Sequence, residues 1–168
     1  MIDIVLALEW TKSSDLELTI EFLQNTYALV SKNQFARMGV VLYGKEPLPL
    51  IDLVETSAVD KLLGDIRNIP LLQHPAEPAL ALYEAIEMLE DLYEPISSRR
   101  ILFLTASFSS KPKISLADAI VYARSIDGLN YYIFTTSSRR PKWLSNNIAK
   151  EVSILRKGSL IKYLRKII

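Results

Sequence analysis

Short runs of consecutive apolar residues alternate along this chain with longer segments in which apolar residues recur every three or four positions. Runs of this length without polar alternation are typical of strands that are covered on both faces of a sheet. They predict strands at residues 2–8, 38–43, 101–105 and 129–135, with a shorter one at 152–155. A further strand at residues 50–54 is predicted at a sheet edge, because Pro47 and Pro49 remove backbone donors just before it.

The segments between these strands have helical periodicity. In the first of them, five apolar residues at positions 16, 20, 23, 27 and 30 lie on one face of a helix. Further helices are predicted at residues 58–69, from Pro78 to before Pro95, after the capping residue Ser115 and before Gly128, at 141–150 and at 159–167. Strands that alternate with helices predict a doubly wound α/β fold, in which helices cover both faces of a mostly parallel sheet.

Length and composition predict a single domain over residues 1–168. No run of 18 apolar residues occurs, and the first residues lack a basic segment and a cleavage site, so we expect neither a membrane span nor a signal peptide. The absence of cysteine excludes disulfides and thiol chemistry, and it fits a cytoplasmic protein. Together with the many isoleucines and leucines, it also suggests a thermophilic source.

Charge is distributed very unevenly along the chain. Residues 1–95 hold 6 Lys or Arg against 16 Asp or Glu, a net charge of −10. Residues 96–168 hold 14 against 3, a net charge of +11, so the total of +1 hides a strong asymmetry. Such an asymmetry has to be interpreted through the fold, because folding decides whether the two halves are separated in space.

The strand ends carry little that suggests catalysis. Ligands of doubly wound sheets bind beyond the carboxyl ends of the strands. The first strand is followed by EWTKSSD and the fourth by TASFSSKPK, and neither contains a phosphate-binding glycine loop or a nucleophile elbow. His74, the only histidine, lies in a proline-bounded loop, where we expect a solvated side chain. We therefore predict that the protein is not an enzyme.

Three oxygen-bearing side chains follow the first strand at alternate positions, namely those of Glu9, Thr11 and Ser13. Oxygen ligands in such a turn suit Mg²⁺. A simpler interpretation is that Ser13 and Ser14 cap the next helix, with Glu17 completing a capping box, while Thr11 satisfies donors of the turn. The residues alone leave both interpretations open.

In their order, these motifs resemble von Willebrand factor type A (vWA) domains over the whole chain. Where that family has Asp-x-Ser-x-Ser after its first strand, this chain has Glu9-x-Thr11-x-Ser13. The family's Ala-Leu-x-x-Ala helix pattern is matched at residues 81–85, and its Thr-Asp-Gly after the fourth strand corresponds to Thr-Ala-Ser at 105–107. The resemblance implies a Rossmann-like sheet of six strands in the order 3-2-1-4-5-6, with one antiparallel edge strand.

The resemblance also implies the position of a metal-ion-dependent adhesion site (MIDAS), where an acidic residue of the partner completes the coordination of Mg²⁺. Here Glu9 replaces the first aspartate with a longer side chain, and Ala106 replaces the second and cannot bind a cation. We therefore predict a degenerate MIDAS without a cofactor, whose remaining candidate ligands are Glu9, Thr11, Ser13 and Glu77. Binding of Mg²⁺ or Mn²⁺ through these four residues is the alternative.

These features together predict a non-catalytic intracellular protein–protein interaction module that works without metal. The resemblance implies an AAA+ ATPase or a multi-subunit assembly as the class of partner. The candidate partner-binding residues are Glu9, Thr11, Ser13, Glu77 and Ser107 at the top of the sheet, and Arg139, Arg140 and Lys142 in the basic half.

The implied strand order would place the acidic and basic halves on opposite flanks of the sheet. Charged flanks of this kind would orient a partner, or let identical copies associate. The basic flank is expected to expose Arg99, Arg100, Arg139, Arg140, Lys142, Arg156, Lys157, Lys162, Arg165 and Lys166. A nucleic-acid-binding role for this half, with Trp143 as a stacking platform, is a further alternative.

Overall fold

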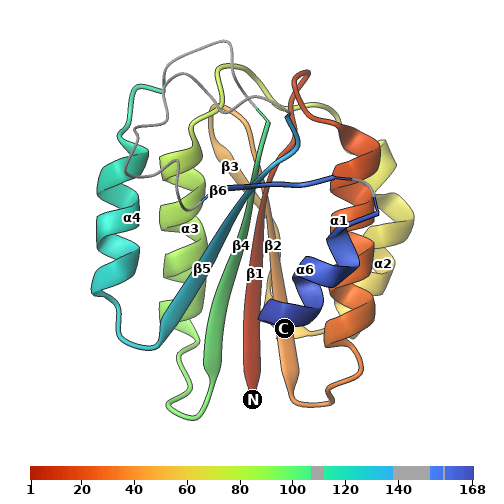
Figure 1. Cartoon of the computed structure of the whole chain (residues 1–168), viewed down its shortest axis with the longest axis vertical. Helices are drawn as coiled ribbons and strands as arrows, with labels where there is room; N and C mark the ends of the chain where they lie inside the picture. Colours follow the sequence, from red (N-terminus) through yellow and green to blue (C-terminus); the bar gives the residue numbers. More distant parts are fainter. Residues whose placement is uncertain (107–111, 138–151, 157) are drawn as a thin grey trace.

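A computed structural model of the chain describes residues 1–106, 112–137, 152–156 and 158–168 (Figure 1). The predicted helix at residues 141–150 lies outside these ranges. The sheet consists of β1 (Ile2–Glu9), β2 (Ala36–Tyr43), β3 (Pro47–Glu55), β4 (Ser98–Thr105), β5 (Leu129–Thr135) and β6 (Val152–Ile154).

The six strands form one sheet in the order β3-β2-β1-β4-β5-β6. All neighbouring strands run parallel except β3, which is antiparallel to β2 at one edge. The predicted fold class, strand order and antiparallel edge strand are therefore confirmed. β3 begins at Pro47, before the predicted residue 50, because prolines are tolerated on an edge strand.

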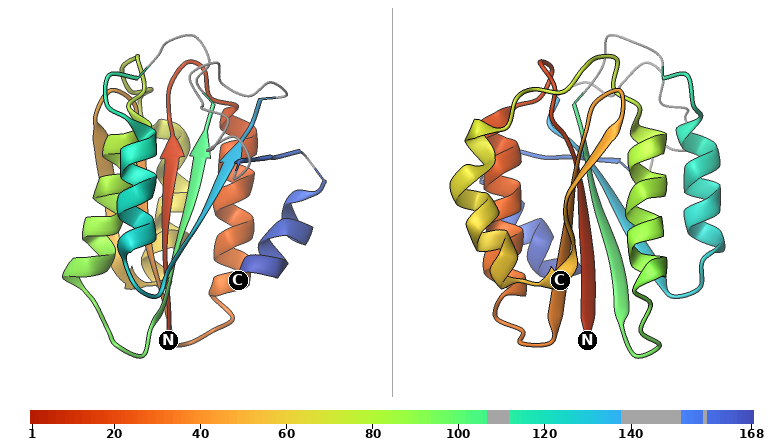
Figure 2. Two further views of the ribbon diagram at one scale, coloured as in Figure 1. Left: turned by 60° about the vertical axis from the view of Figure 1, so that its left-hand side comes forward. Right: turned by 180° about the vertical axis from the view of Figure 1, so that it is seen from behind.

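Helices cover both faces of this sheet (Figure 2). The helical elements are α1 (Leu16–Val30), α2 (Ser57–Asp65), the 3₁₀ turn η1 (Ile66–Asn68), α3 (Pro78–Asp91), α4 (Leu116–Ser125) and α6 (Leu160–Ile167). α3 and α4 pack on one face, and α1, α2 and α6 on the other. The predicted helix at 58–69 is therefore divided into α2 and η1. None of the helices in the described ranges is long and apolar enough to cross a membrane.

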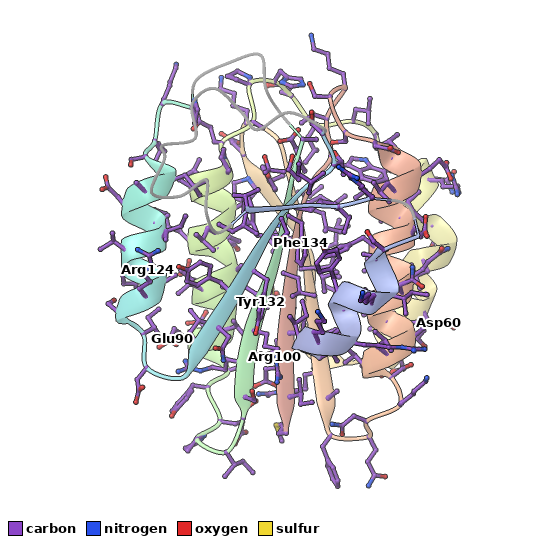
Figure 3. The ribbon with its side chains drawn as sticks, viewed as in Figure 1. Asp60, Glu90, Arg100, Arg124, Tyr132 and Phe134 are labelled. Carbon is purple, nitrogen blue, oxygen red and sulfur yellow. The ribbon has the colours of Figure 1, made fainter. Side chains whose placement is uncertain are left out.

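Two apolar cores lie on either side of β1, which explains why its sequence shows no polar alternation. Val5 and Ala7 point towards α3 and α4, whereas Ile4, Leu6 and Leu8 point towards α1 and α6. All five side chains have 0% exposure. Burial of a large aliphatic side chain contributes about 1.5–3 kcal/mol, so β1 stabilises both layers at once. On the second face, β5 contributes Phe134, which is labelled in Figure 3. The centroid of its ring lies 5.4 Å from that of Phe22.

A buried carboxylate holds the amino end of the sheet together. Asp3 has 0% exposure, and its two oxygens each accept a hydrogen bond of 2.8 Å from the guanidinium of Arg37. Ser97 donates to the same carboxylate, and Arg37 also donates to the carbonyl of Leu92 at 2.9 Å. The hydrogen bonds that Arg37 donates to Asp3 raise the pKa of Arg37. This network connects β1, β2 and the segment between α3 and β4.

Two arginines expected on an exposed basic flank are not surface charges. Arg99 is 5% exposed, forms an ion pair with Glu90, donates to the carbonyl of Asp127 and lies over the ring of Tyr93. Arg100 is half-buried, and its Nη1 has no hydrogen-bond partner among the described residues. The predicted exposure of Arg99 and Arg100 is therefore wrong, because side chains of β4 face the covered sides of the sheet.

Candidate functional site

The candidate site lies at the carboxyl ends of β1, β2 and β4, at the top of the sheet in Figure 1. Trp10 fixes the turn that follows β1. Its backbone N–H donates to Tyr43 O at 2.9 Å, its carbonyl accepts from Leu72 N at 2.8 Å, and its indole Nε1 donates to Ile69 O at 3.1 Å. With only 1% of the side chain exposed, Trp10 ties the turn after β1 to β2 and to the loop before α3.

Glu9 is buried and its carboxylate is hydrogen-bonded on both oxygens. Oε2 accepts from Thr11 Oγ1 at 3.1 Å. Oε1 accepts from the backbone N–H of Ala106 at 3.3 Å and, at the longer distance of 3.5 Å, from Thr105 Oγ1. The side chain is 1% exposed. The glutamate therefore joins the ends of β1 and β4, and Ala106 contributes its backbone where the vWA pattern has a metal-binding side chain.

Thr11, Ser13 and Ser14 shape the turn after β1. Thr11 Oγ1 accepts from Ser13 N at 3.3 Å, which confirms the prediction that Thr11 satisfies a donor of the turn. Ser14 Oγ accepts from Thr11 N at 3.0 Å and donates to Glu9 O at 2.7 Å. The cap of α1 is Asp15, whose Oδ1 accepts from the third helical N–H at 3.1 Å. The predicted capping box at Ser14 and the capping roles of Ser13 and Ser14 are therefore wrong.

His74 is brought to this turn by the loop before α3. Its Nε2 lies 3.1 Å from Ser13 Oγ, and the side chain is half-buried, so the expectation of a solvated histidine is wrong. The peptide bond between His74 and Pro75 is cis. The loop packs closely on the end of β2, because Lys45 N donates to Gln73 O at 2.7 Å and a Cβ on Gly44 would lie only 2.5 Å from that same oxygen.

Glu77 directly precedes α3 and is 5% exposed, and the donors to its carboxylate differ from those of Glu9. Oε1 accepts from Lys113 N at 3.1 Å and Oε2 from Ile114 N at 3.3 Å, both in the segment before α4. Its own N–H donates to Gly44 O at 2.9 Å. The two carboxylates of the predicted degenerate MIDAS thus belong to separate hydrogen-bond networks.

The carboxylate of Glu9 is already hydrogen-bonded within the protein. Mg²⁺ requires nearly octahedral oxygen ligands at about 2.0–2.1 Å. Across the described ranges, no group of three or more His, Asp or Glu side chains could hold a metal. A cation at Glu9 would have to share the carboxylate with the hydroxyl of Thr11 and the N–H of Ala106, which both donate to it. The structure links Glu9, Thr11 and Ser13 by hydrogen bonds, whereas the carboxylate of Glu77 is bonded to the segment before α4.

Tyr43 lies buried near Glu9 and connects β2 to β4 across β1. Its hydroxyl donates to Leu104 O at 3.0 Å, and its ring stacks on Phe103 with centroids 5.3 Å apart. Burial, together with the negative charge of Glu9, raises the pKa of Tyr43 well above its usual value. The phenol therefore stays neutral over a wide pH range.

Several predicted contact residues cannot be placed in this site. Ser107, Arg139, Arg140 and Lys142 lie outside the described residues, as do Trp143 and Lys157. The remaining predicted basic residues are exposed, namely Arg156, Lys162, Arg165 and Lys166.

The sequence interpretation missed a hollow next to the turn. It has a volume of about 350 Å³ and lies between the start of α1 and the segment after η1. Trp10, Leu16, Ile20 and Ile69 contribute apolar walls, and Leu71 at its rim is 48% exposed. The only sequence signal was the tryptophan directly after a strand, because the segments that form the hollow are distant in the sequence.

No protein-family profile matches the sequence. No curated protein matches it significantly either. Solved structures do resemble it. The VWA domain of SpRpn10 is 12% identical with a TM-score of 0.68, over 99% of this chain and 94% of that one. An aerotolerance-related membrane protein from Bacteroides fragilis, with several mutations to serine, is 14% identical with a TM-score of 0.69, over 99% and 96%.

A third structure is a von Willebrand factor type A protein from Catenulispora acidiphila, 14% identical with a TM-score of 0.68. The match covers 99% of this chain but 41% of that one, so this chain spans less than half of its length. The class defined by the sheet and its two helical layers is the Rossmann-like doubly wound domain. Within that class, the fold is that of the vWA domains.

Proposed function

We propose that the chain is a cytoplasmic, non-catalytic protein–protein interaction module, whose partner docks on the top of the sheet without a metal ion. The observation that carries this proposal is the hydrogen bonding of Glu9. Both of its carboxylate oxygens accept from groups of the protein, at 3.1 Å from Thr11 and 3.3 Å from Ala106. These hydrogen bonds offset part of the cost of burying the carboxylate of Glu9, which a bound cation offsets in a MIDAS.

The top surface has features that suit protein recognition. Lys12 is exposed at the tip of the turn, and Ser13 and His74 beside it are half-buried. The hollow next to Trp10 could take one side chain of a partner, since its lining combines apolar residues with the polar Glu17, Arg67 and Asn68 and lies beside the exposed Leu71. Compact apolar pockets with polar surroundings are typical of interface anchor sites.

The Ser13–His74 pair is the closest approach to a catalytic arrangement. A nucleophilic serine requires a base that is itself oriented by a third group. Among the described residues, no group is hydrogen-bonded to the other ring nitrogen of His74. This favours a structural role for the pair, in which it attaches the loop before α3 to the turn after β1.

As the class of partner we propose an AAA+ ATPase or a multi-subunit assembly, which the sequence resemblance to vWA domains implies. A second way of docking uses charged surfaces, although the predicted separation of the two halves is incomplete, because the basic α6 packs against α1 of the acidic half. The metal-dependent alternative differs in one respect, because its binding would disappear when divalent cations are removed.

The proposal is tested by capture of partners from a lysate of the source cells, in EDTA and in millimolar Mg²⁺. We expect the same protein to be captured in both. A double variant of the top surface, Lys12→Glu with Leu71→Asp, should lose it. The matched control is Lys32→Glu with Val121→Asp, which makes the same changes at exposed positions far from the turn. Capture that requires Mg²⁺, or equal loss in the control, would contradict the proposal.

A further inference from the structure

An acidic groove lies between β3 and α3, away from the top of the sheet. Its volume is about 360 Å³. Every charged side chain that lines it is acidic: Asp52, Glu84, Glu87 and Asp91. Met88, which is 7% exposed, and Leu92, which is 42% exposed, complete the lining with apolar surface. The groove thus combines an apolar base with a purely negative rim.

The acidic residues of the groove repel one another along α3. Glu84, Glu87 and Asp91 follow one another on α3 at intervals of three and four, so their carboxylates are neighbours on one helical face. Like charges at this spacing destabilise a helix. No ion pair within the described residues involves any of the three. A partner with positive charge at matching positions would remove this repulsion.

The outer surface of α6 has the complementary properties. Leu160 and Leu164 are buried and hold the helix against the protein. Ile161, Lys162, Arg165 and Lys166 are exposed and occupy one continuous helical face, because they too are spaced by three and four residues. Ile161 is 45% exposed, and α6 contains no acidic residue. We call these four residues the basic face of α6.

We propose that the basic face of α6 of one copy docks in the acidic groove of a second copy of this chain. Ile161 would cover the apolar base at Met88, while Lys162, Arg165 and Lys166 would pair with the carboxylates of α3. Charge complementarity supports this choice of occupant, since both surfaces belong to the described part of the same chain and each presents three charged residues of one sign on one helix.

The positions of the two surfaces determine the kind of assembly. The groove is next to β3 and α3, whereas α6 packs against α1 on the opposite face of the sheet. In Figure 1, α6 is in front and β3 behind, and the rear view in Figure 2 brings β3 and α3 forward. Each copy therefore keeps one unoccupied surface after docking. Such head-to-tail contacts produce open chains or rings, and never a twofold symmetric dimer.

The association should be weak and sensitive to salt. A helix of 8 residues is only about 12 Å long, so the contact is small. Much of the attraction is electrostatic, and the screening length falls from about 30 Å at 0.01 M salt to about 3 Å at 1 M. This inference does not depend on the partner proposed for the top of the sheet, and the purified chain alone is enough to test it.

The test is sedimentation equilibrium of the purified chain over a range of concentrations, at about 0.01 M and about 1 M salt. Two double variants test the two surfaces separately. Glu84→Lys with Glu87→Lys reverses charges in the groove, and Lys162→Glu with Lys166→Glu reverses charges on the basic face of α6. We expect the average mass of the wild type to rise beyond that of a dimer at low salt and to return to a monomer at high salt. Each variant alone should associate at least tenfold more weakly.

The decisive measurement is an equimolar mixture of the two variants. The lysines introduced into the groove of one variant can then pair with the glutamates introduced on α6 of the other, so the mixture should associate again. A matched control reverses exposed charges elsewhere, as Lys32→Glu with Lys61→Glu, and should behave as the wild type. A monomeric wild type at low salt, a mass that stops at a dimer, or a mixture that stays monomeric would each overturn the proposal.

Discussion

Replacement of Glu9 by alanine should destabilise the protein substantially, although the same change removes a buried charge. The carboxylate accepts from Thr11 Oγ1 at 3.1 Å and from Ala106 N at 3.3 Å. Both donors would lose their acceptor in a place that water does not reach, because Glu9, Thr11 and Ala106 are each no more than 3% exposed. Glu9→Gln keeps the size of the side chain and one acceptor oxygen, so it should destabilise less.

The magnitude follows from these contacts. A hydrogen bond to a charged group contributes about 1.5–3 kcal/mol, and the relief of carboxylate desolvation offsets part of the loss. For two such bonds we expect Glu9→Ala to lower the free energy of unfolding by about 3 kcal/mol, which is roughly 6–12 °C in melting temperature for a domain of this size. Glu9→Gln should lose about half as much. Glu46→Ala, at an exposed glutamate, is the matched control and should melt close to the wild type.

The assay is thermal and urea unfolding of the four proteins, in EDTA and in millimolar Mg²⁺. We expect the same order of stability in both buffers. If the wild type bound a cation, a cation concentration of about 100 times the dissociation constant would raise its free energy of unfolding by roughly 2.7 kcal/mol. Such a shift, lost in Glu9→Ala, would refute the metal-independent interpretation. A Glu9→Ala protein as stable as the Glu46→Ala control would refute the structural role of the carboxylate.

Three further perturbations probe other contacts, each by its effect on unfolding. Gly44→Ala should lower the melting temperature, because its Cβ would lie 2.5 Å from a backbone oxygen, whereas Gly64→Ala, with nothing within 4 Å, should raise it by the helix propensity of alanine. The wild type should lose stability as pH rises above about 10, because Tyr43 loses its proton in the unfolded state but keeps it in the native state, where its pKa is raised. The Tyr43→Phe variant should lose less stability over the same pH range. Asp3→Ala should lower the free energy of unfolding in urea by about 3 kcal/mol, because it leaves Arg37 without its carboxylate partner. The double variant with Arg37→Met should recover part of this loss.

The elements of the fold could be predicted because each is marked by a local pattern. β5 has the predicted bounds, Leu129–Thr135, and the prolines of β3 correctly predicted an edge strand. The cap of α1 could not be chosen from the sequence, because Ser13, Ser14 and Asp15 are all capping residue types. The choice falls on Asp15 because the hydroxyl of Ser14 is bonded to the carbonyl of Glu9.

The site was less predictable because its contacts join distant segments. His74 and Ser13 are 61 positions apart, and Glu77 finds its donors 36 and 37 positions further on. No spacing rule connects such residues. The burial of Arg99 has the same origin, because it depends on Glu90 of α3 and on the carbonyl of Asp127.

The central position of β1 has a consequence for synthesis on the ribosome. β1 is the first strand to be made, yet one of its two neighbours, β4, ends only at residue 105. At about 5–20 residues per second, the roughly 60 residues from the end of β2 to the end of β4 take about 3–12 s to appear. During that interval one edge of an apolar strand has no pairing partner, and nascent chains that are close together on one messenger RNA could pair through it.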